Sequence, residues 1–319
     1  MSFYLNILKR LFFYLFLPFL FIELSARLFF SVYTRYKGSF PLELSPFAWN
    51  INFVADFFKE KLVMFAEHDE LGWFVRSNVD IVFQVSEYNS RIKTVEVING
   101  IGGRDDGINK EVFALALGDG YTFCDGLEIK DCWTEILEDM LGKDVLNLGV
   151  SGYGTYQQYL LAKKVLQKMQ FRLILWQITY VDYLKDDCFI SRRNCNVFSP
   201  NLVFYKKPFL GDILGESFIL GSIKSVFDIY ETRKIYRNIR APHIKYIEEI
   251  QNLCSTCQIL IVETYKVADS LRRDLCRRFR CIRKPPNDEK YFFKDKHLNP
   301  QGNLYLAQQV FETIKELGL

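Results

Sequence analysis

Histidine is scarce in this sequence, because only His68, His243 and His297 occur among 319 residues. So few imidazoles leave little room for a histidine-based metal centre, and no cluster of histidine and cysteine has the spacing of zinc ligands. We therefore predict no metal and no cofactor. His68 and His243 are expected to be surface or packing residues.

Net charge is also small, at +3, and it is concentrated at the amino terminus. Residues 1–40 contain five basic residues and one acidic residue, which gives +4 and leaves −1 for the remainder. This distribution argues against a nucleic-acid-binding surface, so no nucleic acid is expected as a partner. A hydrophobic content of 49% and a charged content of 25% are typical of a globular protein and exclude general disorder.

A strongly apolar, uncharged run of twelve residues, Leu11–Ile22, follows two basic residues. Twelve residues are too few to cross about 30 Å of hydrocarbon, but apolar residues continue on both sides. The pattern predicts that residues 1–35 form a membrane anchor, with a cytoplasmic amino terminus and an exported body. A cleaved signal peptide is the alternative, although residues 24–26 lack a small residue at the first position of a cleavage site.

Eight cysteines are an even number, which permits disulfides in an exported domain. Cys188 and Cys195 are close in sequence, as are Cys276 and Cys281, but connectivity does not follow from sequence. The motif Cys254-Ser-Thr-Cys257 suggests a redox pair. A thioredoxin-type pair opens a helix after a strand, however, whereas this one closes a predicted helix before a strand. We expect structural or free cysteines.

Short apolar runs alternate with amphipathic segments from residue 111 onward. Strands are expected at 112–117, 145–148, 173–178, 258–262 and 281–282, and helices at 130–141, 157–169, 243–253, 266–278 and 302–317. This alternation predicts an α/β domain over 111–319, with three α/β/α layers and a parallel sheet of about five strands. Residues 36–110 are expected to be an irregular segment with short strands, and 188–243 a long insertion or lid.

Glycine-rich and acidic segments follow the predicted strands, where parallel sheets place their chemistry. These segments are Gly118-Asp-Gly120-Tyr-Thr-Phe123, Asn147-Leu-Gly-Val-Ser-Gly152-Tyr-Gly-Thr155, Asp182, and Asp295-Lys-His297-Leu-Asn299-Pro-Gln-Gly302-Asn303. The glycines of the second segment are not followed by the Lys-Ser/Thr of a phosphate loop, which argues against a nucleotide site.

In order and context, these four segments resemble the sequence blocks of the SGNH/GDSL hydrolases. Two upstream segments, Leu71-Gly-Trp73 and 99–105, resemble those of membrane-anchored bacterial members, so the resemblance covers nearly the whole chain. It implies a flavodoxin-like sheet and acyl-ester chemistry. A first-block serine attacks a carbonyl, and a last-block histidine, oriented by an aspartate, takes its proton. The serine N–H, a second-block glycine N–H and a third-block asparagine hold the oxyanion.

The resemblance assigns a position in this sequence to each of these roles. They are His297 as the base, Asp295 as its orienting acid, Gly120 at the nucleophile and first oxyanion position, Gly152 and Val181 at the other oxyanion positions, and Asp119 and Asp182 in support. Glycine cannot form an acyl-enzyme, and valine donates no hydrogen bond. Losing one oxyanion donor lowers the rate about 10²–10³-fold.

A hydrolytically inactive protein is therefore expected. The alternative is an active esterase or acetyltransferase that uses His297 and Asp295 with water, or with Thr122, Cys124 or Ser151 as nucleophile. Another alternative is that one serine was replaced by Gly120 in this particular sequence. A single replacement would not explain why the third oxyanion position is also changed, to Val181, and this argues against it. Glycine at position 120 would also suit a tight strand-to-helix turn.

These expectations combine into a single-pass protein of the bacterial inner membrane, with its domain on the periplasmic or extracytoplasmic side. Relatives act on acyl or acetyl esters, often of envelope polysaccharides, which makes an acylated glycan or a membrane acyltransferase the expected partner. The basic stretch 272–284 is expected to be a solvated face, with binding of an anionic lipid or glycan as the alternative.

Overall fold

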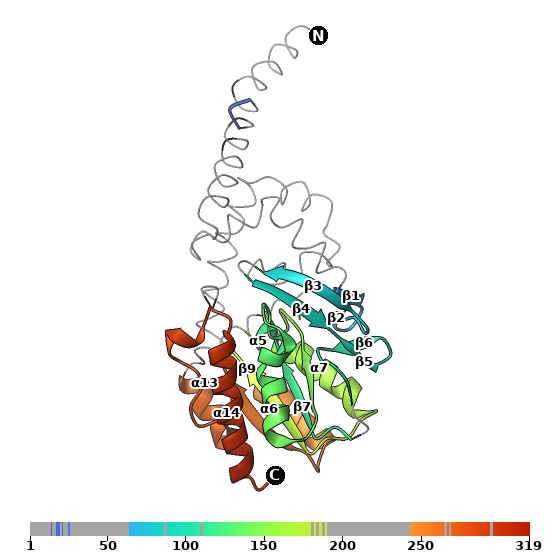
Figure 1. Cartoon of the computed structure of the whole chain (residues 1–319), viewed down its shortest axis with the longest axis vertical. Coiled ribbons are helices and arrows are strands. Elements are labelled where there is room, and N and C mark those ends of the chain that lie inside the picture. The colour runs from blue at the N-terminus through green and yellow to red at the C-terminus, as the bar shows by residue number, and fades with distance from the viewer. Residues whose placement is uncertain are drawn as a thin grey trace. The chain divides into compact units, whose positions relative to one another are not determined.

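The structure, a computed structural model (Figure 1), describes most of the chain from residue 64 onward, in the ranges 64–85, 88–108, 111–179, 243–264, 269–293 and 296–319, with residues 14, 17–19, 21, 25, 182, 185, 186, 189 and 267. Internal contacts divide the chain into two units: Met1–Lys59 with Tyr205–Glu231, and Glu60–Phe204 with Thr232–Leu319. All helices and strands given below belong to the second unit.

Much of the predicted amino-terminal anchor lies outside the described residues, as do nearly all of 188–243. Within the part of the chain that the structure describes, no helix is both long and apolar enough to span a membrane. The anchor, the insertion and the localisation therefore remain predictions.

A five-stranded sheet forms the centre of the second unit, and all its neighbouring strands are parallel. In spatial order its strands are β11 (Arg280–Cys281), β10 (Gln258–Glu263), β9 (Leu173–Ile178), β7 (Ala114–Gly118) and β8 (Val145–Gly149). Every residue of β7, β8 and β9 is buried, which explains why these strands are continuous apolar runs rather than alternating ones. The predicted parallel sheet is confirmed, with strand ends shifted by at most two residues.

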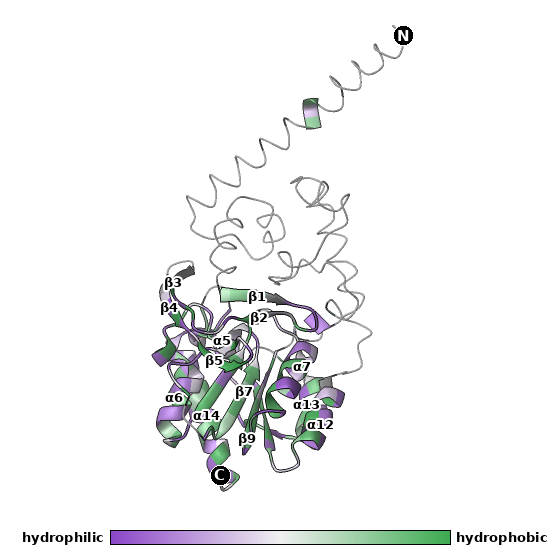
Figure 2. Ribbon diagram, turned by 90° about the vertical axis from the view of Figure 1, so that its right-hand side faces the viewer, coloured by the Kyte–Doolittle hydropathy of each residue, from purple (hydrophilic) through white to green (hydrophobic). Residues whose placement is uncertain are grey.

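Helices cover both faces of this sheet (Figure 2). One face carries α6 (Trp133–Leu141) and α14 (Pro300–Glu316), and the other carries α7 (Thr155–Leu166), α12 (His243–Leu253) and α13 (Asp269–Arg278). Contacts between α6 and α14 and between α7 and α12 agree with this division. The arrangement is the three-layer α/β/α architecture that the sequence predicts.

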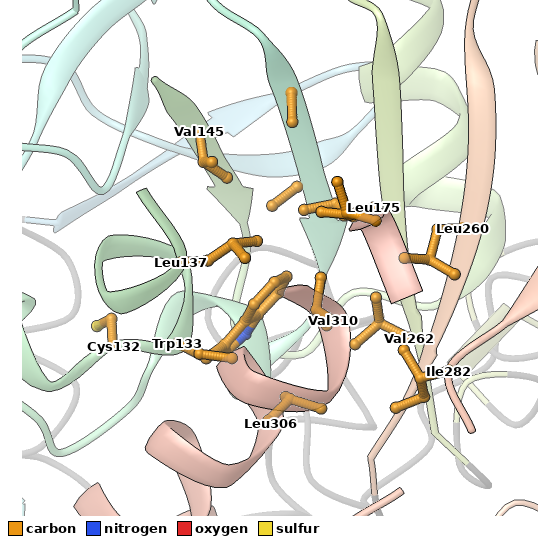
Figure 3. Close-up of a cluster of buried hydrophobic side chains, with 14 of the residues drawn as sticks. Cys132, Trp133, Leu137, Val145, Leu175, Leu260, Val262, Ile282, Leu306 and Val310 are labelled. Atoms are coloured by element: carbon orange, nitrogen blue, oxygen red, sulfur yellow. The ribbon is translucent and has the colours of Figure 1, made fainter. Parts of the chain in front are cut away.

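The core on the α6/α14 face joins strand and helix side chains (Figure 3). Trp133 from α6 is fully buried among aliphatic side chains, including Leu175 and Val262 from the sheet and Leu306 from α14. Burying one such leucine or valine side chain contributes about 1.5–3 kcal/mol to the free energy of folding. This packing fixes the start of α14, and with it the loop that precedes the helix.

The ends of several helices differ from the predicted ones for local reasons. Helix α14 begins two residues early, because Pro300 suits its first turn and the Asn299 side chain accepts a 2.9 Å hydrogen bond from the Gly302 N–H. Helix α6 begins late, because Ile129–Asp131 forms a separate 3-10 helix, η3. A second 3-10 helix, η4 (Glu289–Tyr291), lies before α14.

Three antiparallel hairpins precede the sheet in the sequence. They are β1 (Phe65–His68) with β2 (Gly72–Val75), β3 (Asp80–Val85) with β4 (Tyr88–Lys93), and β5 (Val95–Ile98) with β6 (Ile101–Gly103). Short strands were expected within 36–110, and these hairpins supply them. They belong to the same unit as the sheet, and the Arg104 N–H just after β6 donates to the Asn147 carbonyl oxygen of β8 at 3.0 Å.

Among the described residues, the cysteines form the short-range disulfides Cys254–Cys257 and Cys276–Cys281. The first lies between the end of α12 and the start of β10, as expected for a pair without the helix-opening position of a redox motif. Cys124 and Cys132 are free and buried. Cys188 and Cys195 lie outside the described residues.

The basic stretch 272–284 consists mainly of ion-paired side chains. Partners are present for Arg272 (Glu263), Arg277 (Asp274), Arg278 (Glu248), and Arg280 and Arg283 (both Glu316). Ion pairs between exposed side chains are typical of a solvated face, and binding of an anionic lipid or glycan by this stretch stays an alternative.

Candidate functional site

The loop after β7 forms a single helical turn, α5 (Gly120–Phe123), at the carboxyl edge of the sheet (Figure 1). Asp119 caps this turn, and its side chain accepts a 3.1 Å hydrogen bond from the Tyr121 N–H. Gly120 is the first helical residue, and its φ is not positive. A left-handed backbone is therefore not the reason for glycine at this position, and the space around it must be considered instead.

His297 lies directly opposite Gly120. A Cβ atom built on Gly120 would lie 3.0 Å from His297 Nε2, so the structure brings together the positions that the resemblance gives to nucleophile and base. The His297 carbonyl oxygen accepts a 2.8 Å hydrogen bond from the Phe293 N–H, which closes the loop before α14. The Tyr121 hydroxyl donates to the Lys296 carbonyl oxygen at 2.9 Å and holds this loop beside α5.

A carboxylate occupies the space that a serine side chain would fill. The same Cβ on Gly120 would lie only 2.6 Å from Asp125 Oδ2, which is closer than real Cβ contacts allow. Cys124, with φ of +61°, ends α5 in the left-handed region, and the Asp125 N–H donates to the Gly120 carbonyl oxygen at 3.0 Å. This turn directs the Asp125 side chain back over the first residue of the helix.

Asp125 contacts both other loops of the site. The Ser151 hydroxyl lies 2.8 Å from each carboxylate oxygen, and His297 Nε2 lies 3.8 Å from Oδ2. The side chains of Asp125 and His297 are 15% and 31% exposed, so both are accessible from solvent. We name Asp125, His297 and the buried Ser151 the exposed cluster, after the two partly exposed side chains.

A second group of charges lies at the same edge but is buried. The Lys185 ammonium lies 2.5 Å from Asp119 Oδ2 and 3.4 Å from Asp182 Oδ1, and the three side chains are 8%, 5% and 0% exposed. Burial lowers the pKa of Lys185, but attraction to Asp119 and Asp182 outweighs it, so its pKa is raised and the ammonium stays charged. We name Asp119, Lys185 and Asp182 the buried cluster.

The second-block loop is held from outside by the β1–β2 hairpin. Trp73 Nε1 donates to the Ser151 carbonyl oxygen at 3.3 Å, and the Gln157 side chain donates to the Leu71 carbonyl oxygen at 2.8 Å. Gly152, with φ of +86°, adopts a backbone conformation that glycine allows. The upstream segment 71–73 therefore supports the loop that carries Ser151 and Gly152.

Arg104 supports the first-block loop in the same way. Its guanidinium is 1% exposed and donates to the carbonyl oxygens of Phe123, Cys124 and Leu127. These carbonyls flank Asp125 in the sequence, so a buried arginine from the second upstream segment fixes the turn that carries the carboxylate.

The three alternative nucleophiles have different surroundings. Thr122 is fully buried, and its hydroxyl donates to the Gln177 side chain at 3.2 Å. Burial raises the pKa of Cys124 well above its ordinary value, which disfavours a reactive thiolate. Of these three, Ser151 is the one whose hydroxyl contacts Asp125, the carboxylate beside His297.

Asp295 and Val181 lie outside the described residues, so the orienting acid and the third oxyanion position remain predictions. His68 accepts hydrogen bonds from the backbone N–H groups of Glu70 and Leu71, which is a local turn role. His243 begins α12.

Only one group of potential metal ligands comes together within the described ranges: Glu263, Cys276 and Cys281. The two cysteines share a disulfide, and Glu263 pairs with Arg272, so these residues do not present free thiolates to an ion.

Sequence reasoning missed Asp125 and Lys185 and did not foresee what Arg104 does. Asp125 lies two positions after the end of the first block, and an acidic residue so close to a block was the signal that could have identified it. Lys185 lies 66 positions from Asp119 in the sequence, and no local pattern connects the two.

No protein-family model matches this chain, and no curated protein does either. The solved structures similar to it include a lipolytic protein of the G-D-S-L family from Desulfitobacterium hafniense, at 10% identity over 64% of this chain and 99% of that one, with a TM-score of 0.35. They also include a family two carbohydrate esterase from Clostridium thermocellum in complex with cellohexaose (11% identity, 68% of each chain, TM-score 0.39). A third is an acetyl xylan esterase from Butyrivibrio proteoclasticus, at 10% identity over 69% of this chain and 68% of that one, with a TM-score of 0.37. TM-scores below 0.5 at such identities establish no common function, so the interpretation of the site depends on its own residues.

Proposed function

We propose that this chain is a membrane-anchored protein of the bacterial envelope whose cleft, related to that of SGNH/GDSL hydrolases, binds envelope glycans of the kind that carry acyl groups, without serine-based hydrolysis. The protein either holds such a glycan or presents it to a membrane acyltransferase. One observation carries the proposal: among the described residues, the group opposite His297 Nε2 is the Asp125 carboxylate and not a serine hydroxyl, because Gly120 has no side chain.

The first bond that forms in acyl transfer joins a nucleophilic oxygen to the carbonyl carbon. Acyl transfer needs a nucleophilic oxygen beside the base, and the attacked carbonyl must develop negative charge near oxyanion donors. Here the group beside His297 is a carboxylate, whose negative charge would oppose that development. Loss of a triad nucleophile leaves about 10³–10⁴-fold acceleration over water, from binding and oxyanion donors alone.

The remainder of the site supports binding. Arg104 and Trp73 fix two of the loops that carry it, so the site is preorganised although the serine is missing. Tyr121 lies beside His297, with ring centroids 5.3 Å apart, and offers a half-buried aromatic ring next to the polar groups. Aromatic rings beside a few polar groups are common in ligand sites.

The test uses the full-length chain in detergent with p-nitrophenyl acetate and a fluorophosphonate that labels reactive serines. We expect no turnover above that of a His297→Ala variant and no labelled residue. Turnover that depends on His297 would contradict the proposal.

A second candidate function is a weak esterase with Ser151 as its nucleophile, which the Ser151–Asp125 hydrogen bonds favour. Ser151 would lose its proton to Asp125 and attack the ester carbonyl, and the alcohol would leave with that proton. Water would then attack the acyl-serine and give a proton to Asp125, which passes it to Ser151 as the acid is released. Ser151 is only 3% exposed, which disfavours it as the attacking group. An adduct on Ser151, found by mass spectrometry and absent from Ser151→Ala, would establish this function.

A further inference from the structure

Asp125 changes the chemical character of the position where a hydrolase holds its substrate carbonyl. Its carboxylate lies within 2.6 Å of where the serine Cβ would be, and 3.8 Å from His297 Nε2. An ionised carboxylate only accepts hydrogen bonds, and so does the carbonyl oxygen of an ester. A ligand that presented its acyl carbonyl here would place two acceptors against each other with no proton between them.

Among the described residues, the hydroxyl that contacts Asp125 does not relieve this conflict. Ser151 has a single hydroxyl proton, and its oxygen lies 2.8 Å from both carboxylate oxygens, so that proton is already directed at Asp125. The serine therefore holds the carboxylate in place and leaves its remaining lone pairs for a ligand. A group with protons to give, such as a sugar hydroxyl or an ammonium, satisfies those lone pairs.

The position is accessible to such a ligand. Asp125 and His297 keep 15% and 31% of their side-chain surface exposed, in contrast to at most 8% for the buried cluster. Tyr121, held by its hydroxyl to the Lys296 carbonyl oxygen, offers a ring at the side of His297. The Tyr121 ring gives a ligand apolar contact area in a fixed orientation, and the His297 side chain is a second polar group beside Asp125.

We infer that Asp125 makes this cleft selective for a deacylated glycan, whose free hydroxyl or ammonium group donates to the carboxylate, over the acylated form of the same glycan. The inference rests on the proposed function that the cleft binds a glycan, and it specifies the chemical group that meets Asp125. Within the proposed function, the site then recognises the acceptor of an acyl-transfer reaction, or the product of a deacylation, and not the ester.

Isothermal titration of the full-length chain in detergent at pH 7 tests this inference with three soluble tetrasaccharides. A glucosamine tetramer presents ammonium groups, an N-acetylglucosamine tetramer presents acyl groups, and xylotetraose presents only hydroxyls. We expect the glucosamine tetramer to bind at least about 10-fold more tightly than its acetylated counterpart, the size of one charge-assisted hydrogen bond. Xylotetraose should bind no more tightly than the acetylated tetramer, because both present hydroxyls without an ammonium group. Weak binding of xylotetraose shows that the ammonium is the recognised donor.

Asp125→Asn is the decisive variant, because the amide has nearly the same size and supplies N–H donors of its own. It should weaken the glucosamine tetramer about 10-fold and leave the acetylated tetramer within about threefold, so that the preference disappears. Asp274→Asn, on the exposed side of α13, is the matched control and should keep the wild-type preference. Circular dichroism checks that both variants fold.

The outcomes separate this inference from the proposed function. A wild-type chain that binds the acetylated tetramer as tightly as the glucosamine tetramer, or a preference that survives in Asp125→Asn, overturns the inference and leaves glycan binding standing. No binding of any of the three tetramers up to about 10 mM overturns both.

Discussion

Two clusters of polar and charged residues lie at the same edge of the sheet, and they differ in solvent exposure. The buried cluster of Asp119, Lys185 and Asp182 is at most 8% exposed, whereas Asp125 and His297 in the exposed cluster reach 15% and 31%. In the buried cluster each carboxylate lies within 3.4 Å of the Lys185 ammonium. In the exposed cluster the one possible cation, His297, lies 3.8 Å from the carboxylate.

The difference shows that one cluster holds the structure and the other is able to exchange partners. Removing a partner from a buried ion pair strands a charge away from water, which is strongly destabilising. A partly exposed carboxylate such as Asp125 can lose its partner to water or to a ligand at a lower cost. The comparison therefore predicts that changes in the buried cluster alter folding, while changes in the exposed cluster alter ligand choice.

The largest effect is expected from Lys185→Met. Removing the ammonium leaves Asp119 and Asp182 buried without their shared cation, and we expect the free energy of unfolding to fall by about 3–5 kcal/mol. Urea denaturation followed by circular dichroism measures this. Lys245→Met removes an exposed lysine paired with Glu249 on α12 and should change the free energy by less than about 0.5 kcal/mol. Equal effects of the two changes would remove the distinction between buried and exposed charge.

A slightly smaller loss of stability is expected from Arg104→Met. The change keeps the aliphatic stem but removes charged hydrogen bonds to three backbone carbonyls, and we expect a loss of about 2–3 kcal/mol. Because those carbonyls flank Asp125, the preference for the glucosamine tetramer should weaken as well. The exposed Arg273→Met on α13 serves as the control. A stable Arg104→Met chain with unchanged ligand preference would show that the turn does not need this support.

A further test of the exposed cluster restores the residues that a hydrolase would have at this site. The double change Gly120→Ser and Val181→Asn restores the nucleophile and the third oxyanion donor of the resemblance, but its new Cβ meets Asp125 Oδ2 at 2.6 Å. We expect little turnover of p-nitrophenyl acetate until Asp125→Gly is added, which should raise it about 100-fold. Adding His297→Ala should abolish the gain. Equal turnover with and without Asp125 would show that the carboxylate does not occupy the reactive space.

The smallest effect concerns pH and a third acidic group, which neither cluster contains. Burial raises the pKa of Glu135 to about 7, with a further contribution from Asp106, and burial raises the pKa of Asp105 to about 6. A carboxyl whose pKa is raised on folding binds more protons in the folded state, so stability falls as pH rises from about 4 to about 7. Thermal unfolding at pH 5 and pH 8 measures this.

Glu135→Gln should raise the midpoint temperature at pH 8 by about 3 °C and have little effect at pH 5, because the glutamine carries no charge at either pH. Glu312→Gln, on the exposed side of α14, is the matched control. A midpoint that rises with pH in the wild type would contradict the assignment of Glu135 and Asp105.

The parallel sheet was predictable because strands buried on both faces are continuous apolar runs, as in β7 and β9. The meeting of Gly120 and His297 was predictable only through the resemblance, since 177 residues separate them. The position of Asp125 was not, because it depends on the left-handed backbone of Cys124, a residue type that gives no sign of positive φ. The partners of Lys185 depend on how two loops fold toward each other, and no sequence spacing encodes that.

The central claim is that the group facing His297 is a carboxylate and that no reactive serine replaces it. Treatment of the full-length chain with a fluorophosphonate, followed by mass spectrometry of its peptides, tests this most directly. We predict that no residue carries the phosphonyl group, neither Ser151 nor Thr122. A stoichiometric adduct on Ser151 that is lost in Asp125→Asn would contradict the claim.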